Sequence, residues 1–332
     1  MSVPLGIAVV GLGPAAEPHA KALAELSQRA RVVWAATRSQ ARAAAAAARY
    51  GWPVTTDIAA AITDPAVGAV LVLTPPAAHL EIASRAFAAG KHVLVEKPLE
   101  LTSARAAQLL AAAGDRCLGV VLQHRFRDGA LALRDLLASG RLGRVQAASM
   151  AVPWWRPQAY YDEPGRGTLA RDGGGVLLTQ AVHTLDLFRA LLGVRRVVAA
   201  QVCTTELHRM ETEDHVHALV ELGEGAPASI RATTAAYPGR AESIEVIGTL
   251  GTARFEGSSL AAGFLDGSRL DVVSDGRTGA GAGMMDFDHG PHRALLADFL
   301  DAVAAGRAPQ VTGADALATQ MLIDDILAAA RR

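Results

Sequence analysis

Residues 5–122 alternate short apolar runs, many of them β-branched, with longer segments of helical pattern. Apolar strands between amphipathic helices are typical of a parallel sheet that is covered on both faces. This part of the chain therefore predicts a doubly wound α/β architecture. The expected strands are Leu5–Val10, Val32–Ala36, Ala69–Leu73, His92–Val95 and Cys117–Leu122, and the expected helices are about Ala15–Leu26, Gln40–Arg49, Ala78–Ala89 and Ser103–Ala113.

The pattern changes after Gly129. A helix and a strand lead into an irregular segment over 153–174, and a single long helix is expected at Gly175–Leu192. Strand-like runs separated by short turns follow up to Val273, which predicts an antiparallel meander. The expected runs are Val197–Thr204, His215–Leu222, Ala228–Ala235, Glu242–Ile247, Thr252–Phe255 and Arg269–Val273, and two helices at about Arg293–Ala304 and Asp315–Ala330 close the chain.

A glycine-rich turn joins the first expected strand to the first expected helix. Gly11, Gly13 and Ala16 fit the pattern Gly-x-Gly-x-x-Gly/Ala of dinucleotide-binding turns. Gly11 permits the tight turn, Gly13 lets the backbone approach a pyrophosphate, and the helix N-terminus faces the phosphates. Because strand, turn and helix come in the required order, the sequence predicts a dinucleotide site that includes Gly11, Leu12, Gly13, Pro14 and Ala15.

The end of the second expected strand indicates the type of dinucleotide. NAD-binding domains usually place Asp or Glu there, whereas this chain has Thr37, Arg38 and Ser39 and no carboxylate before Asp57. Arg38 and Arg42 are one helical turn apart, and a guanidinium is suited to bidentate capture of a phosphate. The pattern favours NADP over NAD. The alternative is two solvated arginines beside a site that accepts either cofactor.

Composition argues against several classes of function. A net charge of −1 offers no electrostatic attraction for nucleic acid or an anionic membrane. No apolar run reaches the roughly 18 residues that cross a bilayer, and the N-terminus does not resemble a secretory signal. Cys117 and Cys203 lie in apolar runs and are expected to be reduced core residues, which predicts a cytoplasmic location.

Lys97 stands out because the chain favours arginine. Only three of its 32 basic residues are lysines, and this one follows a short apolar strand within Glu96-Lys97-Pro98. Lysine can give up its proton when its surroundings lower its pKa, whereas arginine cannot. Lys97 is therefore a candidate for proton chemistry, and the alternative is a surface lysine before a turn proline.

Taken together, these residues resemble the glucose–fructose oxidoreductase/inositol dehydrogenase (Gfo/Idh/MocA) family over essentially the whole chain. The markers are the Gly11 turn, Thr74-Pro75-Pro76 with His79, Glu96-Lys97-Pro98, Gln123 with Arg125, Gly173-Gly174-Gly175, Gln180 with His183 and Asp186, Glu245–Thr249 with Gly251-Thr252, and Asp298-Phe299-Leu300.

The resemblance implies an N-terminal Rossmann domain over 1–123 and a C-terminal α+β domain over 124–332, whose large, open, mostly antiparallel sheet serves substrate binding and oligomerisation. The C-terminal helix can pack back on the first domain. The implied protein is a homodimeric or homotetrameric NAD(P)-dependent dehydrogenase or reductase that acts on a CH–OH group of a sugar-, cyclitol- or uronate-like substrate. The nicotinamide is expected over Lys97, in a cleft lined by Thr74, Pro75, Pro76, His79, Glu96 and Gln123.

Interconverting a secondary alcohol and a ketone requires a hydride transfer and one proton exchanged at oxygen. A histidine can exchange that proton near neutral pH, and a nearby ammonium stabilises the developing alkoxide. We assign His183 as the acid/base and Lys97 as the group that polarises the oxygen. These are the two predicted catalytic residues.

The expected substrate contacts are less closely defined. Many relatives carry Asp four residues before the histidine, where this chain has Thr179. We expect Thr179 and Gln180 to hydrogen-bond substrate hydroxyls, and Arg166 to suit an anionic group. Arg125 is a further candidate. For Tyr161, Arg166 and Arg171, in the loop before the helix, ordinary loop packing or solvation is the alternative.

We expect no metal site, because His215 and His217 lack a third ligand at a known spacing. Two other functions stay open. One is an NAD-dependent glycosidase of the same fold, which the arginines near the ribose disfavour. The other is a non-catalytic dinucleotide-binding sensor, which the presence of both Lys97 and His183 disfavours.

Overall fold

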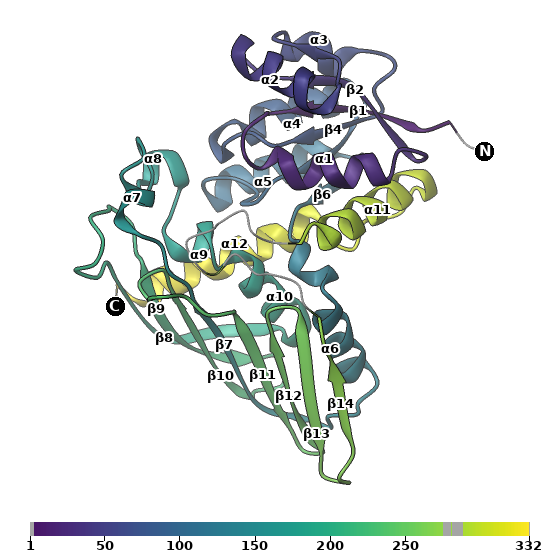
Figure 1. The fold of residues 1–332 in the computed structure, drawn as a ribbon. Helices are drawn as coiled ribbons and strands as arrows, with labels where there is room; N and C mark the ends of the chain where they lie inside the picture. Colours follow the sequence, from purple (N-terminus) through teal and green to yellow (C-terminus); the bar gives the residue numbers. More distant parts are fainter. Residues whose placement is uncertain (1–2, 275–279, 281–287, 332) are drawn as a thin grey trace. The chain divides into compact units, whose positions relative to one another are not determined.

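The computed structural model describes residues 3–274, 280 and 288–331, and these form two compact units (Figure 1). Unit 1 comprises Met1–Leu122 and His289–Leu317, and unit 2 comprises Gln123–Asp288 and Ala318–Arg332. The first boundary lies close to the expected one after Gln123. The segment 289–317, however, belongs to unit 1, although the expected division assigned it to the second domain.

Unit 1 contains a parallel sheet of the order β3-β2-β1-β4-β5-β6. The chain builds outward from β1 on one side and returns to begin β4 on the other, so the order reverses between these two strands. In open α/β sheets, ligands bind at such a reversal, outside the carboxyl ends of the strands. The strands are β1 (Leu5–Val10), β2 (Ala30–Ala36), β3 (Val54–Thr55), β4 (Ala69–Val72), β5 (His92–Val95) and β6 (Leu118–Val120).

Three of the described helices of unit 1 begin where the sequence supplies a capping side chain. Ser39, Asp57 and Thr102 each accept a hydrogen bond from a backbone N–H in the first turn of the helix that follows. The elements β3 and α3 were not predicted from the sequence, and they are only two and six residues long. The helical elements are α1 (Ala16–Glu25), α2 (Gln40–Tyr50), α3 (Ile58–Thr63), the 3₁₀ turn η1 (Pro76–Ala78), α4 (His79–Ala88), α5 (Ser103–Ala113) and α11 (Gly290–Ala305).

Helix α11 comes late in the chain but completes the first unit. It contacts α1, and His289 at its N-terminus lies 2.6 Å from a carboxylate oxygen of Glu25. Arg29 binds Asp301 near the other end of the helix. The last helix, α12 (Gly313–Ala329), continues from unit 1 into unit 2.

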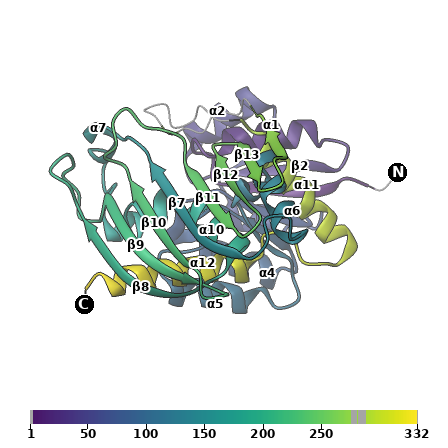
Figure 2. The same ribbon diagram turned by 90° about the horizontal axis from the view of Figure 1, so that it is seen from below.

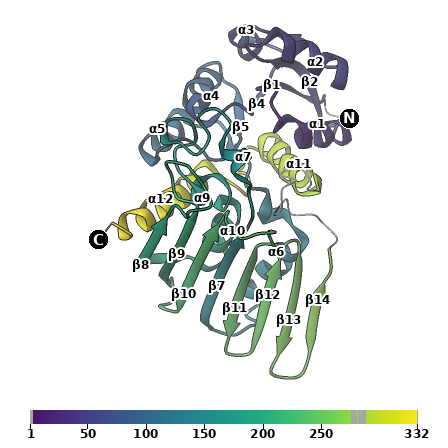
Figure 3. The ribbon, with the colours of Figure 1, turned by 60° about the vertical axis from the view of Figure 1, so that its left-hand side comes forward.

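Unit 2 is built on an eight-stranded sheet of the order β14-β13-β12-β11-β7-β10-β9-β8, which is plain in Figure 3. Only the pairing of β10 with β7 is parallel; the other strand pairs are antiparallel. The fold class predicted from the sequence is therefore confirmed for both sheets. The strands are β7 (Val145–Pro153), β8 (Val194–Cys203), β9 (His215–Leu222), β10 (Pro227–Thr233), β11 (Ser243–Gly248), β12 (Gly251–Glu256), β13 (Ser259–Phe264) and β14 (Arg269–Val272).

Helices α6 and α10 lie against one face of this sheet (Figure 2). Strand β9 alternates accordingly: Val216 and Val220 are buried, whereas His217 and Leu219 on the other face are exposed. The helical elements of unit 2 are η2 (Gln123–Phe126), α6 (Asp128–Ala138), α7 (Gln158–Tyr161), α8 (Leu169–Asp172), α9 (Val176–Thr179) and α10 (Val182–Leu192).

Two expectations about unit 2 and the cysteines were wrong. Strand β13 was missed, because its Ala- and Gly-rich sequence has little strand propensity and it forms by pairing with strands on both sides. Cys203 is exposed at the end of β8 and Cys117 is half-buried, so they are not both core residues. Within the described residues, no helix combines the length and apolar character needed to span a bilayer.

Candidate functional site

The turn after β1 requires glycine at its first position. Gly11 has a φ of +105°, and a Cβ there would lie 2.6 Å from the carbonyl carbon of Leu73. Gly13 differs, because a Cβ built on it would have no protein atom within 4 Å. Packing within the protein thus explains Gly11, whereas the backbone at Gly13 borders open space that a ligand can approach.

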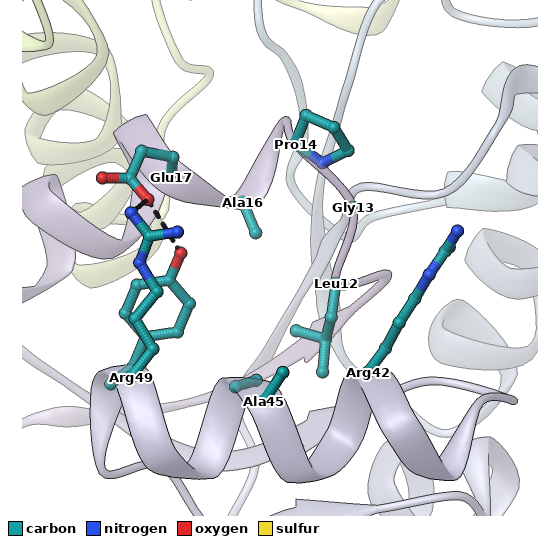
Figure 4. A pocket seen from close by; sticks show the side chains of 10 residues that line it. Leu12, Gly13, Pro14, Ala16, Glu17, Arg42, Ala45 and Arg49 are labelled. Carbon is teal, nitrogen blue, oxygen red and sulfur yellow. Dashed lines mark hydrogen bonds and ion pairs between the residues drawn. The ribbon is translucent and has the colours of Figure 1, made fainter.

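A pocket of about 260 Å³ opens beside this turn (Figure 4). Tyr50 donates a hydrogen bond of 3.0 Å to Glu17, and Arg49 lies 2.5 Å from the same carboxylate. The side chain of Arg42 extends from α2 on the side where Leu12 and Gly13 lie. The lining residues are Leu12, Gly13, Pro14, Ala16, Glu17, Arg42, Ala45, Ala46, Arg49 and Tyr50.

The residues predicted to bind near the ribose of the dinucleotide have separate roles in the structure. Ser39 caps α2 by accepting a hydrogen bond from the N–H of Arg42 at 3.3 Å, and Thr37 is buried. Arg42 lines the pocket, whereas Arg38 is not among the lining residues. Arg42 has no carboxylate partner among the described residues, so its charge is available to an anion there.

His79 lies inside unit 1 and links two loops. It is fully buried, and its two ring nitrogens lie 2.9 Å from the carbonyl oxygen of Thr74 and 3.2 Å from that of Leu99. Burial lowers the pKa of His79. This histidine therefore ties the turn after β4, with Thr74, Pro75 and Pro76, to the segment after Lys97. A direct contact between His79 and the cofactor stays a prediction.

Glu96, directly after β5, is the centre of a buried cluster in unit 1. His19 of α1 lies 2.9 Å from its Oε1, and Oε2 accepts the backbone N–H of Lys97 at 3.0 Å. The ring of His292 from α11 packs edge-on against that of His19, with centroids 5.4 Å apart. Burial raises the pKa of Glu96, but His19, His292 and Lys97 outweigh burial and lower it overall. The charged carboxylate thus fixes the backbone at Lys97.

In unit 2, the glycine run 173–175 leads into α9. The amides of Gly175 and Leu177 donate to the carboxylate of Glu213, at 3.1 and 3.3 Å. A Cβ on Gly175 would lie 1.9 Å from the carbonyl oxygen of Glu213, so no other residue fits there. Burial raises the pKa of Glu213. Gly175 appeared in the sequence only as a marker of the family resemblance, and Glu213 was not predicted to bind it.

The expected single helix over Gly175–Leu192 is two helices, and that expectation was wrong. The N–H of Ala181 bonds the carbonyl of Val176, five residues back, at 2.8 Å, which widens the last turn of α9. Helix α10 begins anew at Val182, so His183 lies in its first turn. The break gives His183 an orientation that a continuous helix would not.

His183 is nearly buried and stacks on a second histidine, His124 of η2. Their ring centroids are 4.9 Å apart and the ring planes differ by 26°. Three residues after His183, the fully buried Asp186 accepts two hydrogen bonds from Arg125 and one from Thr319. His124 was not predicted from the sequence, although it lies between Gln123 and Arg125, which are both markers of the family resemblance.

The predicted substrate contacts have protein partners of their own. Thr179 donates to the carbonyl of Gly175 at 2.7 Å, and Gln180 donates to the hydroxyl of Tyr160 at 3.2 Å. Arg166 lies 2.6 Å from the carboxylate of Glu163. The hydroxyl of the buried Tyr161 lies 2.6 Å from that of Thr234. Substrate contacts by Arg125, Thr179, Gln180, Tyr161 and Arg166 stay predictions.

Two family models match successive parts of this chain. The model described as "Oxidoreductase family, NAD-binding Rossmann fold" matches residues 5–124, and the model "GFO/IDH/MocA C-terminal domain" matches residues 130–254. The chain belongs to the Gfo/Idh/MocA family. The resemblance inferred from the sequence is thereby confirmed.

Relatives within the Gfo/Idh/MocA family include dehydrogenases of cyclitols and sugars. Inositol 2-dehydrogenase of Streptomyces avermitilis is 40% identical over 148 residues, which are 43% of this chain and 43% of that enzyme. The match thus spans less than half of that relative. Inositol 2-dehydrogenase 2 of Paenarthrobacter aurescens is 27% identical over 321 residues, covering 94% of this chain and 91% of the enzyme.

A solved structure agrees with the fold over almost the whole chain. The WlbA dehydrogenase of Bordetella pertussis, solved in complex with NADH and UDP-GlcNAcA, superimposes with a TM-score of 0.83 at 26% identity. The superposition covers 99% of this chain and 97% of that protein. An NAD-binding Rossmann domain is thus supported by both sequence and structure.

Proposed function

We propose that the protein is an NADP(H)-dependent oxidoreductase that interconverts a secondary alcohol and a ketone on a sugar-, cyclitol- or uronate-like substrate. The observation that carries this proposal is the turn at Gly11–Gly13. Its first glycine is required by packing, whereas its second borders open space next to a pocket with a cation, Arg42. This is the arrangement that a dinucleotide phosphate requires.

The residues present fit a bound nicotinamide dinucleotide. Gly11, Leu12, Gly13, Pro14 and Ala15 would hold the pyrophosphate, and Arg42, with Arg38, would hold a 2′-phosphate. When bound, the nicotinamide gives or accepts the hydride at the reacting carbon. We infer the preference for NADP from the arginines alone. The WlbA relative was solved with NADH and does not support that preference.

We propose that Lys97 and His183 handle the proton at the substrate oxygen. In the reductive direction, the Lys97 ammonium polarises the carbonyl oxygen while the carbon receives the hydride. The His183 imidazolium then gives its proton to the resulting alkoxide, and the product is the alcohol. In the oxidative direction His183 takes that proton. Glu96 assists by fixing the backbone N–H of Lys97.

The catalytic part is tested with Lys97→Met and His183→Gln. Each should lower kcat at least about 100-fold, the usual scale for such groups, while NADPH binding stays unchanged. To find a substrate, the wild type is first screened against a panel of sugars, inositols and uronic acids, with the cofactor absorbance followed at 340 nm. Release of aglycone from aryl glycosides without net cofactor turnover would indicate the glycosidase instead, and turnover unchanged in both variants would refute the assignment.

The cofactor preference is tested separately with Arg42→Ala and Arg38→Ala. Losing a charge-assisted phosphate contact should raise the KM for NADPH at least about tenfold and leave the KM for NADH unchanged. Arg31→Ala, on the exposed part of β2, is the matched control. Equal effects on both cofactors would show that neither arginine reads a 2′-phosphate.

We also propose that the protein is a homodimer or homotetramer formed through the sheet of unit 2, in the cytoplasm. The large apolar side chains of Val198, Leu219 and Ile247 are 42–56% exposed there. Light scattering after gel filtration tests the assembly, and replacing Leu219 with Lys should produce monomers. An unchanged mass for that variant would argue against this face.

A further inference from the structure

We infer that His124 is a positioning residue for His183: it holds the catalytic imidazole in place by ring stacking. This inference rests on the proposed function of His183 as the acid/base. The contact itself lies within unit 2 and involves two nearly buried side chains, with rings 4.9 Å apart and 26° from parallel.

His124 can serve as a platform because both of its ring nitrogens face fixed groups. Its Nδ1 makes a long hydrogen-bond contact of 3.4 Å with the hydroxyl of Thr184, the residue after His183. Its Nε2 faces Oε1 of Glu242 at 4.0 Å. A ring held at both edges cannot rotate about its last side-chain bond without losing one of these partners.

Glu242 is itself held in place, so the edge of His124 that faces Glu242 has a fixed neighbour. This carboxylate is fully buried, binds the guanidinium of Arg127, and accepts a hydrogen bond of 3.0 Å from the indole N–H of Trp154. Arg127 also donates to the carbonyl of Gly257 at 2.7 Å. The chain of contacts thus runs from the start of β11 through His124 to the first turn of α10.

The stacking geometry is suited to orienting the ring of His183 and is not suited to passing a proton between His183 and His124. The N–H bonds of an imidazole lie in the plane of its ring, whereas stacked rings meet through their faces. A proton on His183 is therefore not directed at a nitrogen of His124. What stacking does provide is a flat surface that restricts the second side-chain torsion of His183, which is otherwise broad. Small errors in the position of an acid/base group can cost about 100-fold in rate.

The test compares His124→Ala, which removes the platform, with His124→Phe, which keeps a flat ring but no ionisable group. For His124→Ala we expect kcat to fall about 10- to 100-fold with the KM for NADPH unchanged. For His124→Phe we expect kcat to recover to within about threefold of the wild type. Thr184→Val, which removes one edge contact but keeps the ring of His124, should stay nearer to the wild type than to His124→Ala, and His217→Ala on the exposed face of β9 should match the wild type.

A second readout does not depend on turnover. The ring protons of His183, assigned with His183→Gln in histidine-labelled protein, should shift in His124→Ala and return toward their upfield positions in His124→Phe. If the wild type turned over no substrate, the proposed function would fail while this readout still tested the stacking. Unmoved His183 signals in His124→Ala, or a kcat in folded His124→Phe as low as in His124→Ala, would overturn the inference.

Discussion

Arg125 binds both carboxylate oxygens of Asp186, at 2.6 and 2.7 Å, across two elements of unit 2. Asp186 is fully buried, and Arg125 is only 13% exposed. The hydroxyl of Thr319 adds a third hydrogen bond to the same carboxylate, at 2.8 Å. Because Asp186 lies one helical turn after His183, this ion pair fixes the helix that carries the proposed acid/base.

Replacing Asp186 with Asn should therefore be costly. The change leaves the charge of Arg125 buried and uncompensated, so we expect a loss of about 3–5 kcal/mol in the free energy of unfolding. Urea unfolding followed by tryptophan fluorescence measures it. Asp135→Asn, at an exposed carboxylate next to Arg134, is the control and should change stability by no more than about 0.5 kcal/mol. Equal effects of the two variants would contradict the structural role.

The two glycines of the turn after β1 should respond differently to alanine. Gly11→Ala places a Cβ 2.6 Å from backbone atoms at a φ of +105°, so we expect a clearly lowered Tm or no folded protein. Gly13→Ala meets no protein atom and should keep its Tm, yet weaken NADPH binding at least about tenfold. Thermal unfolding and NADPH fluorescence titration separate the two effects. Normal binding by Gly13→Ala would mean that the dinucleotide does not approach this backbone.

Unit 1 should lose stability in acid through Glu100. Burial raises the pKa of this carboxyl, but hydrogen bonds from Arg105 and from the amides of Leu101 and Leu80 outweigh burial and lower it below its ordinary value of 4.5. The stabilisation is therefore complete above about pH 4.5 and is lost as the pH falls through the lower folded value.

The measurement is urea unfolding between pH 7 and pH 3.5. Glu100→Gln should be less stable than the wild type at pH 7, by about 1.5–3 kcal/mol, and should lose less on acidification. Glu81→Gln, at an exposed carboxylate of the same unit, should retain the pH dependence of the wild type. A steep loss in Glu100→Gln equal to that of the wild type would show that other groups control acid unfolding.

The two thiols should differ in reactivity. Burial raises the pKa of Cys117 to about 11, so about one thiol in a thousand is ionised at pH 8. Cys203 is exposed. A disulfide reagent such as DTNB should modify Cys203 rapidly and Cys117 slowly at pH 8. Cys203→Ser should abolish the fast phase, and its persistence would contradict the structure.

Local sequence signals predicted the buried strands well because each is a continuous apolar run with a clear end. His92–Val95 has the predicted bounds, since Gly90 and Lys91 precede it and charged residues follow. The break between α9 and α10 was not predictable in the same way. The apolar pattern continues through Gln180 and Ala181, and the wide turn depends on a hydrogen bond between Ala181 and Val176 that no periodicity shows.

Residue types that carry chemistry make Gly11, Lys97 and His183 candidates from the sequence alone, and the catalytic roles of Lys97 and His183 stay predictions. Roles that depend on contacts between distant parts of the chain were missed. Arg127 and Glu242 are 115 residues apart, and His124 gains its surroundings only when the sheet of unit 2 brings Glu242 beside it. A histidine between two polar residues gives no local signal of that environment.

The discontinuous course of unit 1 has a consequence for biosynthesis. The ribosome releases residues 1–122 first, but α11, with the His292 that joins His19 and Glu96, emerges only after residues 123–288. The nucleotide-binding half is therefore completed only after residues 123–288, which belong to unit 2, have been translated. A nascent chain halted before residue 289 would carry Lys97 on a scaffold that lacks the segment 289–317.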